Sequence, residues 1–356
     1  FAGYGLLLCA KGDIEQGYRY GELALVLKER TNAKAYKART WFVVESMIRH
    51  WKRPIRESLP AFLAIYHEAL ETGDVEFAAL AIELYCEYSF IAGVPLGETE
   101  SEMLGYRKTI QQFKQETVLN FNAIHHQSVL NLMGHAKDPC RLIGEAYDEE
   151  KMLPKHLEEH DETALVDLYL HKVILCFLFE DYPKAAAYAQ DSEQHIMGIS
   201  GTAGYPLHHF FASLAKLGIF PTVNPAEKKR LLKQVQQSQK KLKHWARHAP
   251  MNYQHKCDLL AAELARISEE TPAAMFLYTQ AIQGAKDQGF LHEEALANIL
   301  AAKFYHTLGQ EAIAKVYMRE GYYLCQSWGA LAFIKHLELR YPHLVPQSRI
   351  SAELTQ

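Results

Sequence analysis

The sequence predicts an all-helical protein in which antiparallel helix hairpins stack into a superhelix. Small and large side chains recur at a fixed offset near the C-terminal end, and turn signals fall at helix-length intervals. The 356 residues are 49% hydrophobic and 22% charged, which suffices for a large core. Strands have little support, because no Asn-Gly, Asp-Gly or Gly-Gly hairpin signal occurs.

A forty-residue offset relates side chains in the last hundred residues. The matched pairs are Ala262 and Ala302, Ala265 and Tyr305, Ala274 and Ala314, Tyr278 and Met318, and Ala281 and Gly321. In helix-hairpin repeats, small residues stand where two antiparallel helices touch, and bulky ones fill the gap between hairpins. We therefore predict helix crossings at Ala262, Ala274, Ala281, Ala302, Ala314 and Gly321.

Breaks between helices can be placed along the whole chain. In order, they are Gly12-Asp13, Pro54, Gly73-Asp74, Gly93-Val94-Pro95, Asp138-Pro139, Asp161, Asp181-Tyr182-Pro183, 218–225, Pro250, Thr271-Pro272, Gly289, Gly309 and Pro342. At Thr271-Pro272, the Thr hydroxyl is expected to cap a new helix, and Pro fits its first turn. Gly289 and Gly309 are expected to end helices in the left-handed conformation.

Two stretches interrupt this regular pattern. Residues 132–160 and 198–226 are rich in Gly and Pro, so short helices and long connections are expected there. They are either hinges or binding loops, or plain connectors between superhelical segments. We expect one elongated helical repeat domain over residues 1–346, followed by a tail over 347–356. The chain starts at Phe1 in what we expect to be the middle of a helix, so we expect this polypeptide to be a piece of a larger protein.

The formal net charge of −4 gives no global reason to expect a nucleic-acid or membrane partner. The apolar run 6–10 is too short to span a membrane and lacks signal-peptide flanks. Six widely spaced cysteines lie mainly in apolar stretches, so reduced core thiols in the cytoplasm are expected. They are Cys9, Cys86, Cys140, Cys176, Cys257 and Cys325.

A basic amphipathic helix is expected around residues 228–243, where seven cations occur without an acid. Leu231, Val235, Leu242 and Trp245 form one apolar stripe, and most cations take the opposite side. The candidate partner-binding residues are Lys229, Lys233, Lys240, Lys241 and Lys243. This helix could bind an acidic partner or nucleic acid, or it could be a solvated outer helix. Glutamines rather than aromatics separate the cations, so base stacking has no support.

No constellation for catalysis, metal or cofactor binding stands out. The phosphate-binding P-loop signature is missing, and the acidic runs at 148–150 and 158–162 resemble helix starts. The histidine pairs His156 with His160 and His244 with His248 have i,i+4 spacing but lack further ligands at zinc-site spacing. We therefore expect no catalytic residues, no cofactor and no metal, and no enzyme in this stretch of chain.

Several segments together resemble the helical region of large bacterial, cyanobacterial-type multi-sensor signal transduction kinases. The segments are Trp51, 54–60, 70–74, 85–88, 114–116, 130–132, 147–150, 152–154, 248–252, 294–298, 302–305, Tyr317, 328–330, 337–338 and 341–342. The resemblance implies a TPR-like superhelix. It also implies a serine/threonine kinase domain and a STAND-like AAA ATPase before this region, with GAF and histidine-kinase domains after it.

The function expected from these observations is a non-catalytic regulatory scaffold. It would bind a protein partner or effector and couple it to flanking ATPase and kinase domains of the same polypeptide, because a stacked array offers a long, rigid surface. Two alternatives stay open. One is a helical enzyme with its active site in the groove, and the other is a nucleic-acid-binding array that uses residues 228–243.

Overall fold

The computed structural model describes residues 1–30 and 34–346, so the expected tail over 347–356 lies outside the described residues. Seventeen α-helices and four 3₁₀ helices (η) occur in this part of the chain. In order they are α1 Ala2–Ala10, α2 Ile14–Arg30, α3 Lys34–Met47, η1 Arg49–Trp51, η2 Ile55–Glu57, α4 Ser58–Glu71, α5 Val75–Ile91, α6 Leu96–Gln112, α7 Glu116–Met133, α8 Glu149–Glu158, α9 Glu162–Leu178, α10 Tyr182–Gln194, η3 Ile196–Ile199, α11 Gly204–Ile219, η4 Phe220–Thr222, α12 Pro225–His248, α13 Pro250–Ile267, α14 Thr271–Asp287, α15 Leu291–Thr307, α16 Glu311–Trp328 and α17 Leu331–Arg340.

Consecutive helices pack side by side, which is the arrangement of an α-helical solenoid. The pairs α4 with α5, α9 with α10, α13 with α14 and α15 with α16 have the most extensive contacts. One hydrophobic core runs through the array from Cys9 to Leu344. The only β-bridge among the described residues joins Ile143 and Asp148, so the all-helical prediction is confirmed for them.

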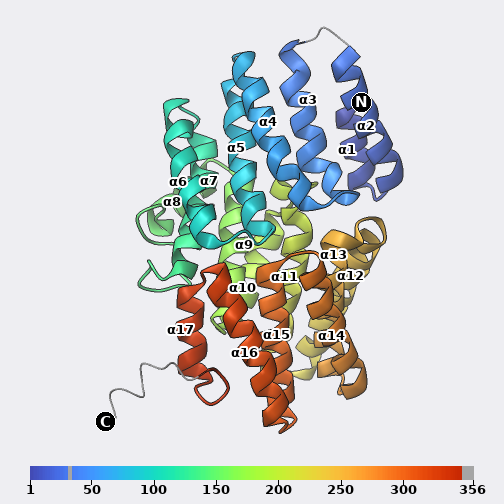
Figure 1. The fold of residues 1–356 in the computed structure, drawn as a ribbon, viewed down its shortest axis with the longest axis vertical. Coiled ribbons are helices and arrows are strands. Elements are labelled where there is room, and N and C mark those ends of the chain that lie inside the picture. The colour runs from blue at the N-terminus through green and yellow to red at the C-terminus, as the bar shows by residue number, and fades with distance from the viewer. Residues whose placement is uncertain (31–33, 347–356) are drawn as a thin grey trace.

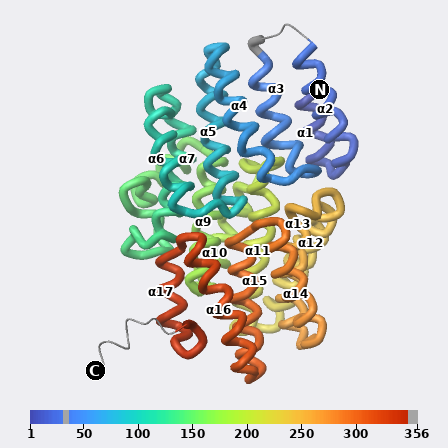
Figure 2. Tube along the Cα trace, in the orientation of Figure 1, coloured from blue at the N-terminus to red at the C-terminus, as the bar shows by residue number. Residues whose placement is uncertain are grey.

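The stack also returns toward its own beginning. Figure 1 shows α1 to α5 along the top and α12 to α16 below them, and the trace in Figure 2 follows the same path. Helix α17 packs against α7. Below the first helices, His50 and Arg56 contact Asn252, Tyr253 and Gly289, which are followed closely in the sequence by the buried ion pairs of Glu293 with His255 and Lys256. We call this contact region the junction.

Helix ends agree with most of the predicted turn chemistry. Gly289 and Gly309 are left-handed, with φ of 74° and 72°, and they follow α14 and α15 as predicted. Pro272 lies in the first turn of α14, but the predicted Thr271 cap is wrong. Thr271 is already the first helical residue, and Glu270 takes the cap position without a side-chain bond.

The six predicted crossing residues Ala262, Ala274, Ala281, Ala302, Ala314 and Gly321 are all buried. They lie on α13, α14, α15 and α16, the two hairpins of the forty-residue repeat. At Gly321 the helices approach very closely, because a Cβ atom there would lie 2.7 Å from Ile299 Cγ1. Only glycine fits this point of the α15–α16 contact without displacing a neighbour.

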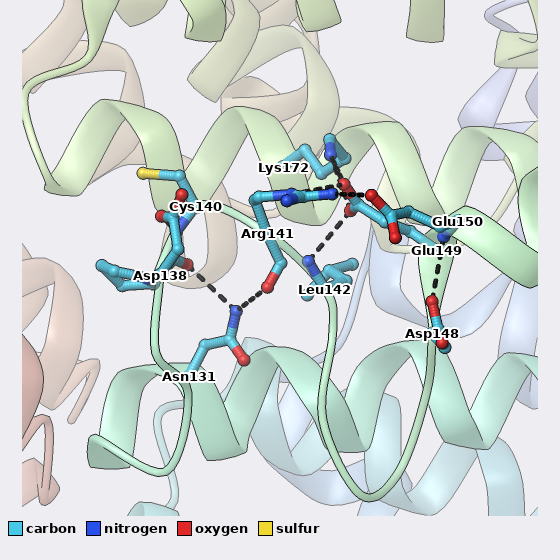
Figure 3. A network of polar contacts seen from close by, with 10 residues as sticks. Asn131, Asp138, Cys140, Arg141, Leu142, Asp148, Glu149, Glu150 and Lys172 are labelled. Atoms are coloured by element: carbon cyan, nitrogen blue, oxygen red, sulfur yellow. Dashed lines mark hydrogen bonds and ion pairs between the residues drawn. The ribbon is translucent and has the colours of Figure 1, made fainter.

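The connection between α7 and α9 is tied to both helices by buried polar contacts (Figure 3). Asn131 donates to the carbonyl oxygens of Pro139 and Arg141 over 3.0 and 2.7 Å. The Lys172 ammonium lies 2.6 Å from both carboxylate oxygens of Glu149, which also accepts the Leu142 N–H. Satisfied bonds of this kind hold a long connection in one conformation.

Residues 198–226 are more regular than the sequence predicts. Helix α11 occupies Gly204–Ile219 and is largely buried. Of the glycines and prolines that indicated a connection, Gly204, Pro206 and Gly218 stand in its first and last turns, where they are compatible with a helix, and the others lie outside it. Composition alone could not separate a helix with Gly and Pro at its ends from a loop.

Candidate functional site: a cationic cleft

A cleft of about 720 Å³ opens on the described surface. It lies between the C-terminal end of α1, the segment that enters α11 and the last turns of α12. This volume is within the range of ligand sites, which is roughly 300–1,000 Å³. The three walls come from distant parts of the sequence, so the cleft exists only because the chain returns on itself.

Cations dominate the cleft wall. Lys11 of the α1 end faces Lys240, Lys241, Lys243 and Arg247 of α12, all exposed. On α12, residues three, four and seven positions apart share one helical face, which explains how 240, 243 and 247 reach the same hollow. No aspartate or glutamate of the described residues lines it. The cleft therefore attracts anions despite the net negative charge of the chain.

Aromatic rings supply the apolar part of the cleft. Trp51 and Trp245 have ring centroids 5.5 Å apart, and Tyr205 packs edge-on against Trp245 at 5.6 Å. The sequence places Trp245 in the apolar stripe of the basic helix, but it gives no sign that Trp51 and Tyr205 lie beside it. The three rings come from η1, α11 and the end of α12. The cleft can thus bind an apolar group and an anionic group together.

His50 holds the segments below the cleft in place. Its Nδ1 accepts the Tyr253 hydroxyl over 2.6 Å, and its Nε2–H donates to the Gly201 carbonyl over 2.7 Å. Burial lowers the pKa of His50 to about 4, so the ring is neutral at pH 7 and can fill both roles. Asn252 adds three further bonds, to His50 O, Arg53 O and Ile55 N.

One cation of the cleft is fixed by a polar network. The Lys241 ammonium donates to the Tyr205 hydroxyl over 3.1 Å and to His209 Nε2 over 3.2 Å. Burial lowers the pKa of His209 to about 3, and the nearby Lys241 charge acts in the same direction. A neutral His209 can accept from Lys241 and donate through Nδ1 to Ser238. This network orients Lys241 at the cleft.

The predicted partner surface divides into two parts. Lys240, Lys241 and Lys243 line the cleft, whereas Lys229 and Lys233 are exposed near the start of α12 and do not. The predicted apolar stripe of Leu231, Val235, Leu242 and Trp245 is buried, which confirms the amphipathic character of this helix.

Two buried charged clusters were not recognised in the sequence. In one, His125 lies 2.9 Å from Glu83 and 3.6 Å from Asp167, bridging α5, α7 and α9. Burial opposes the charged ring, but Asp167 and Glu83 outweigh it and raise the pKa of His125 well above its ordinary value. The three side chains are at most 8% exposed, so no substrate reaches them, and a structural role explains them.

The second cluster lies in the junction and joins α13 to α15. Glu293 pairs with His255 and with Lys256, whose ammonium lies 2.8 Å away. Burial disfavours the Glu293 carboxylate, but Lys256 and His255 outweigh burial and keep its pKa below the usual range. For Lys256, burial lowers the pKa more than Glu293 raises it. Such a pair is costly to bury and costly to break.

The two histidine pairs considered as metal ligands differ in geometry. His156 is buried in α8 against Tyr147, but His160 follows the helix with φ of 53°, so the expected shared helical face is wrong. His244 and His248 both lie on α12, with ring centroids 5.1 Å apart. Neither pair belongs to a group of three possible ligands among the described residues.

Comparison with known proteins gives one short similarity. No family model matches the chain. A stretch of 60 residues is 38% identical to part of hybrid signal transduction histidine kinase G of Dictyostelium discoideum. The match covers 17% of this chain and 2% of that protein, so it provides only a loose link to signal transduction kinases. No helix in residues 1–30 and 34–346 has the length and apolar character that membrane crossing requires.

Proposed function

We propose that this chain is a regulatory scaffold segment of a larger signalling protein and that its cationic cleft binds an acidic segment of a protein partner. The observation that carries the proposal is the cleft itself, which is lined by five exposed cations, by Tyr205 and by the largely buried rings of Trp51 and Trp245, with no acid among its described lining residues. A short peptide with acidic and aromatic side chains matches both features. The resemblance to multi-sensor kinases and the match to a histidine kinase support the signalling context.

The arrangement of the cleft suits regulation. Its walls belong to α1, α11 and α12, and its floor rests on the junction. A ligand that bridges these walls would favour the closed superhelix over any looser one, because a ligand shifts an equilibrium only through differential affinity. In this proposal the TPR-like array transmits that preference to flanking kinase and ATPase domains.

The binding test uses a fluorescein-labelled peptide rich in Asp, Glu and Phe, with fluorescence anisotropy as the readout. The variant Lys240→Glu/Lys243→Glu changes the cleft, and Lys229→Glu/Lys233→Glu makes the same charge change elsewhere on α12. We expect the cleft variant to weaken binding by about 10-fold or more and the control to have a much smaller effect. Equal effects would show that only the overall charge matters.

Two further measurements separate the alternatives. Affinity should fall as salt rises, since exposed cations are screened. Tighter binding of a single-stranded oligonucleotide than of the peptide would replace the acidic-segment proposal with the nucleic-acid alternative. Small-angle scattering with saturating peptide tests the regulatory part, and identical curves with and without peptide would count against a conformational response.

A further inference from the structure

Two histidines and a glutamate meet at the C-terminal end of the array, far from the cleft in the sequence. His306 is in the last turn of α15, Glu311 begins α16, and His343 follows α17. Their ligand atoms all lie within 4.8 Å of one another. His306 Nδ1 is 2.5 Å from Glu311 Oε1, and the two imidazole centroids are 5.2 Å apart.

The backbone fixes these three positions. Between α15 and α16, Gly309 is left-handed and the Gln310 N–H donates to the Tyr305 carbonyl, which brings His306 and Glu311 together. His343 belongs to a turn in which the Leu344 N–H donates to the Tyr341 carbonyl over 2.9 Å. Leu344 is only 2% exposed and anchors this turn against the core. The site is therefore assembled before any ligand arrives.

The chemistry of the three groups matches a transition-metal ion. Two imidazoles and a carboxylate gather their ligand atoms in one small space, and the His306–Glu311 contact involves only two of the three groups. Zn²⁺ is commonly bound by two imidazoles and one carboxylate, with a water in the fourth position. Mg²⁺ and Ca²⁺ prefer sets made of oxygen ligands, so they fit less well.

We propose that His306, Glu311 and His343 form a Zn²⁺ site that clips the turn at residues 341–345 to the turn between α15 and α16. This is the one group of three possible ligands found in residues 1–30 and 34–346. Lys315 and Arg319 of α16 line the hollow beside His343, and their charge opposes a bound cation. Affinity must therefore come from direct bonds to the three ligands.

The test uses the full chain without a histidine tag. Co²⁺ replaces Zn²⁺ as a spectroscopic probe, because its visible absorption bands report a tetrahedral site, and Zn²⁺ should then displace it. We expect one equivalent to bind. His343→Gln and Glu311→Gln should each weaken binding by at least about 10-fold.

The matched control is His67→Gln, which removes an exposed histidine of α4 and should leave the absorption bands unchanged. Melting in EDTA checks folding, and equal melting temperatures for all variants are expected because the three ligands are exposed or half-exposed. The proposal is overturned if the unmodified chain shows no saturable bands or if the bands persist in His343→Gln. The cleft takes no part in this experiment, so its result leaves the proposed function untouched.

Discussion

The two C-terminal hairpins and the junction hold the same scaffold together by different contacts. Between α13 and α16, neighbouring helices meet through small apolar residues such as Ala274 and Ala314, both fully buried. In the junction, buried His50 and Asn252 join segments about 200 residues apart, and buried Glu293 joins α13 to α15. The first kind of contact repeats along the chain, and the second occurs where the chain returns.

The two kinds of contact differ in how strictly they fix the relative positions of the helices. Apolar contacts between helices tolerate small shifts, because they are not directional. Hydrogen bonds and ion pairs lose their value when the partners move, since an unpaired buried polar group costs free energy. We infer that the junction determines where the chain returns on itself, and that losing one of its buried polar partners costs more stability than overpacking one hairpin contact. Three substitutions or conditions test this comparison, in order of expected effect.

The largest effect is expected from Glu293→Gln in the junction. The substitution leaves the Lys256 ammonium buried without its charged partner, which should lower the free energy of unfolding by about 3–5 kcal/mol. Denaturant unfolding followed by circular dichroism measures the change. Glu320→Gln on the exposed face of α16 serves as the control. A small loss for Glu293→Gln would mean that the buried pair contributes little to stability.

The second-largest effect is expected from acidification, which should weaken the junction. The pKa of His50 is about 4 in the folded chain, below the ordinary value of about 6.5, because burial disfavours the charged ring. The unfolded chain therefore takes up a proton first as the pH falls. Stability should be full above about pH 6.5 and decline toward pH 4, by about 3 kcal/mol from this residue.

Unfolding experiments on His50→Gln isolate this contribution. Glutamine can still donate and accept hydrogen bonds but does not titrate, so the decline between pH 6.5 and 4 should become shallower in the variant. The same pH dependence in both proteins would contradict the assignment of a neutral, buried His50 in the junction.

The smallest effect is expected in the hairpins, from Ala314→Leu. Ala314 is fully buried on α16, so a larger side chain should overpack the contact and cost about 1–3 kcal/mol. Thermal melting measures it, with Ala312→Leu on the exposed face of the same helix as control. If both variants melt at the original temperature, Ala314 does not mark a helix crossing.

The hairpins were predictable from the sequence because their contacts follow a period. Small residues of one hairpin recur in the next hairpin at an offset of forty positions, and glycines follow the helices that carry them. The junction has no such period. Asn252 makes bonds to three backbone groups of residues 50–55, and nothing in the local sequence of either segment indicates the other. The resemblance brought together residues 54–60 and 248–252 without indicating that these segments are neighbours.

The candidate cleft was predictable in part for the same reason. A run of cations without acids identified α12 as a basic helix, including three lysines of the cleft. Lys11 and Tyr205 reach the cleft only through tertiary folding, so local patterns could not assign them. The group of His306, Glu311 and His343 was not identified from the sequence, because His343 is separated from the other two by α16 and α17.

The bond between His50 and Tyr253 spans 203 residues, and this has a consequence during synthesis. At roughly 5–20 residues per second, the ribosome needs on the order of 10–40 s to make the intervening chain. During that interval the first helices are already synthesised, but Trp51 and His50 lack their partners on α12 and α13. Nascent chains of this protein are therefore expected to depend on chaperones most strongly before α13 emerges.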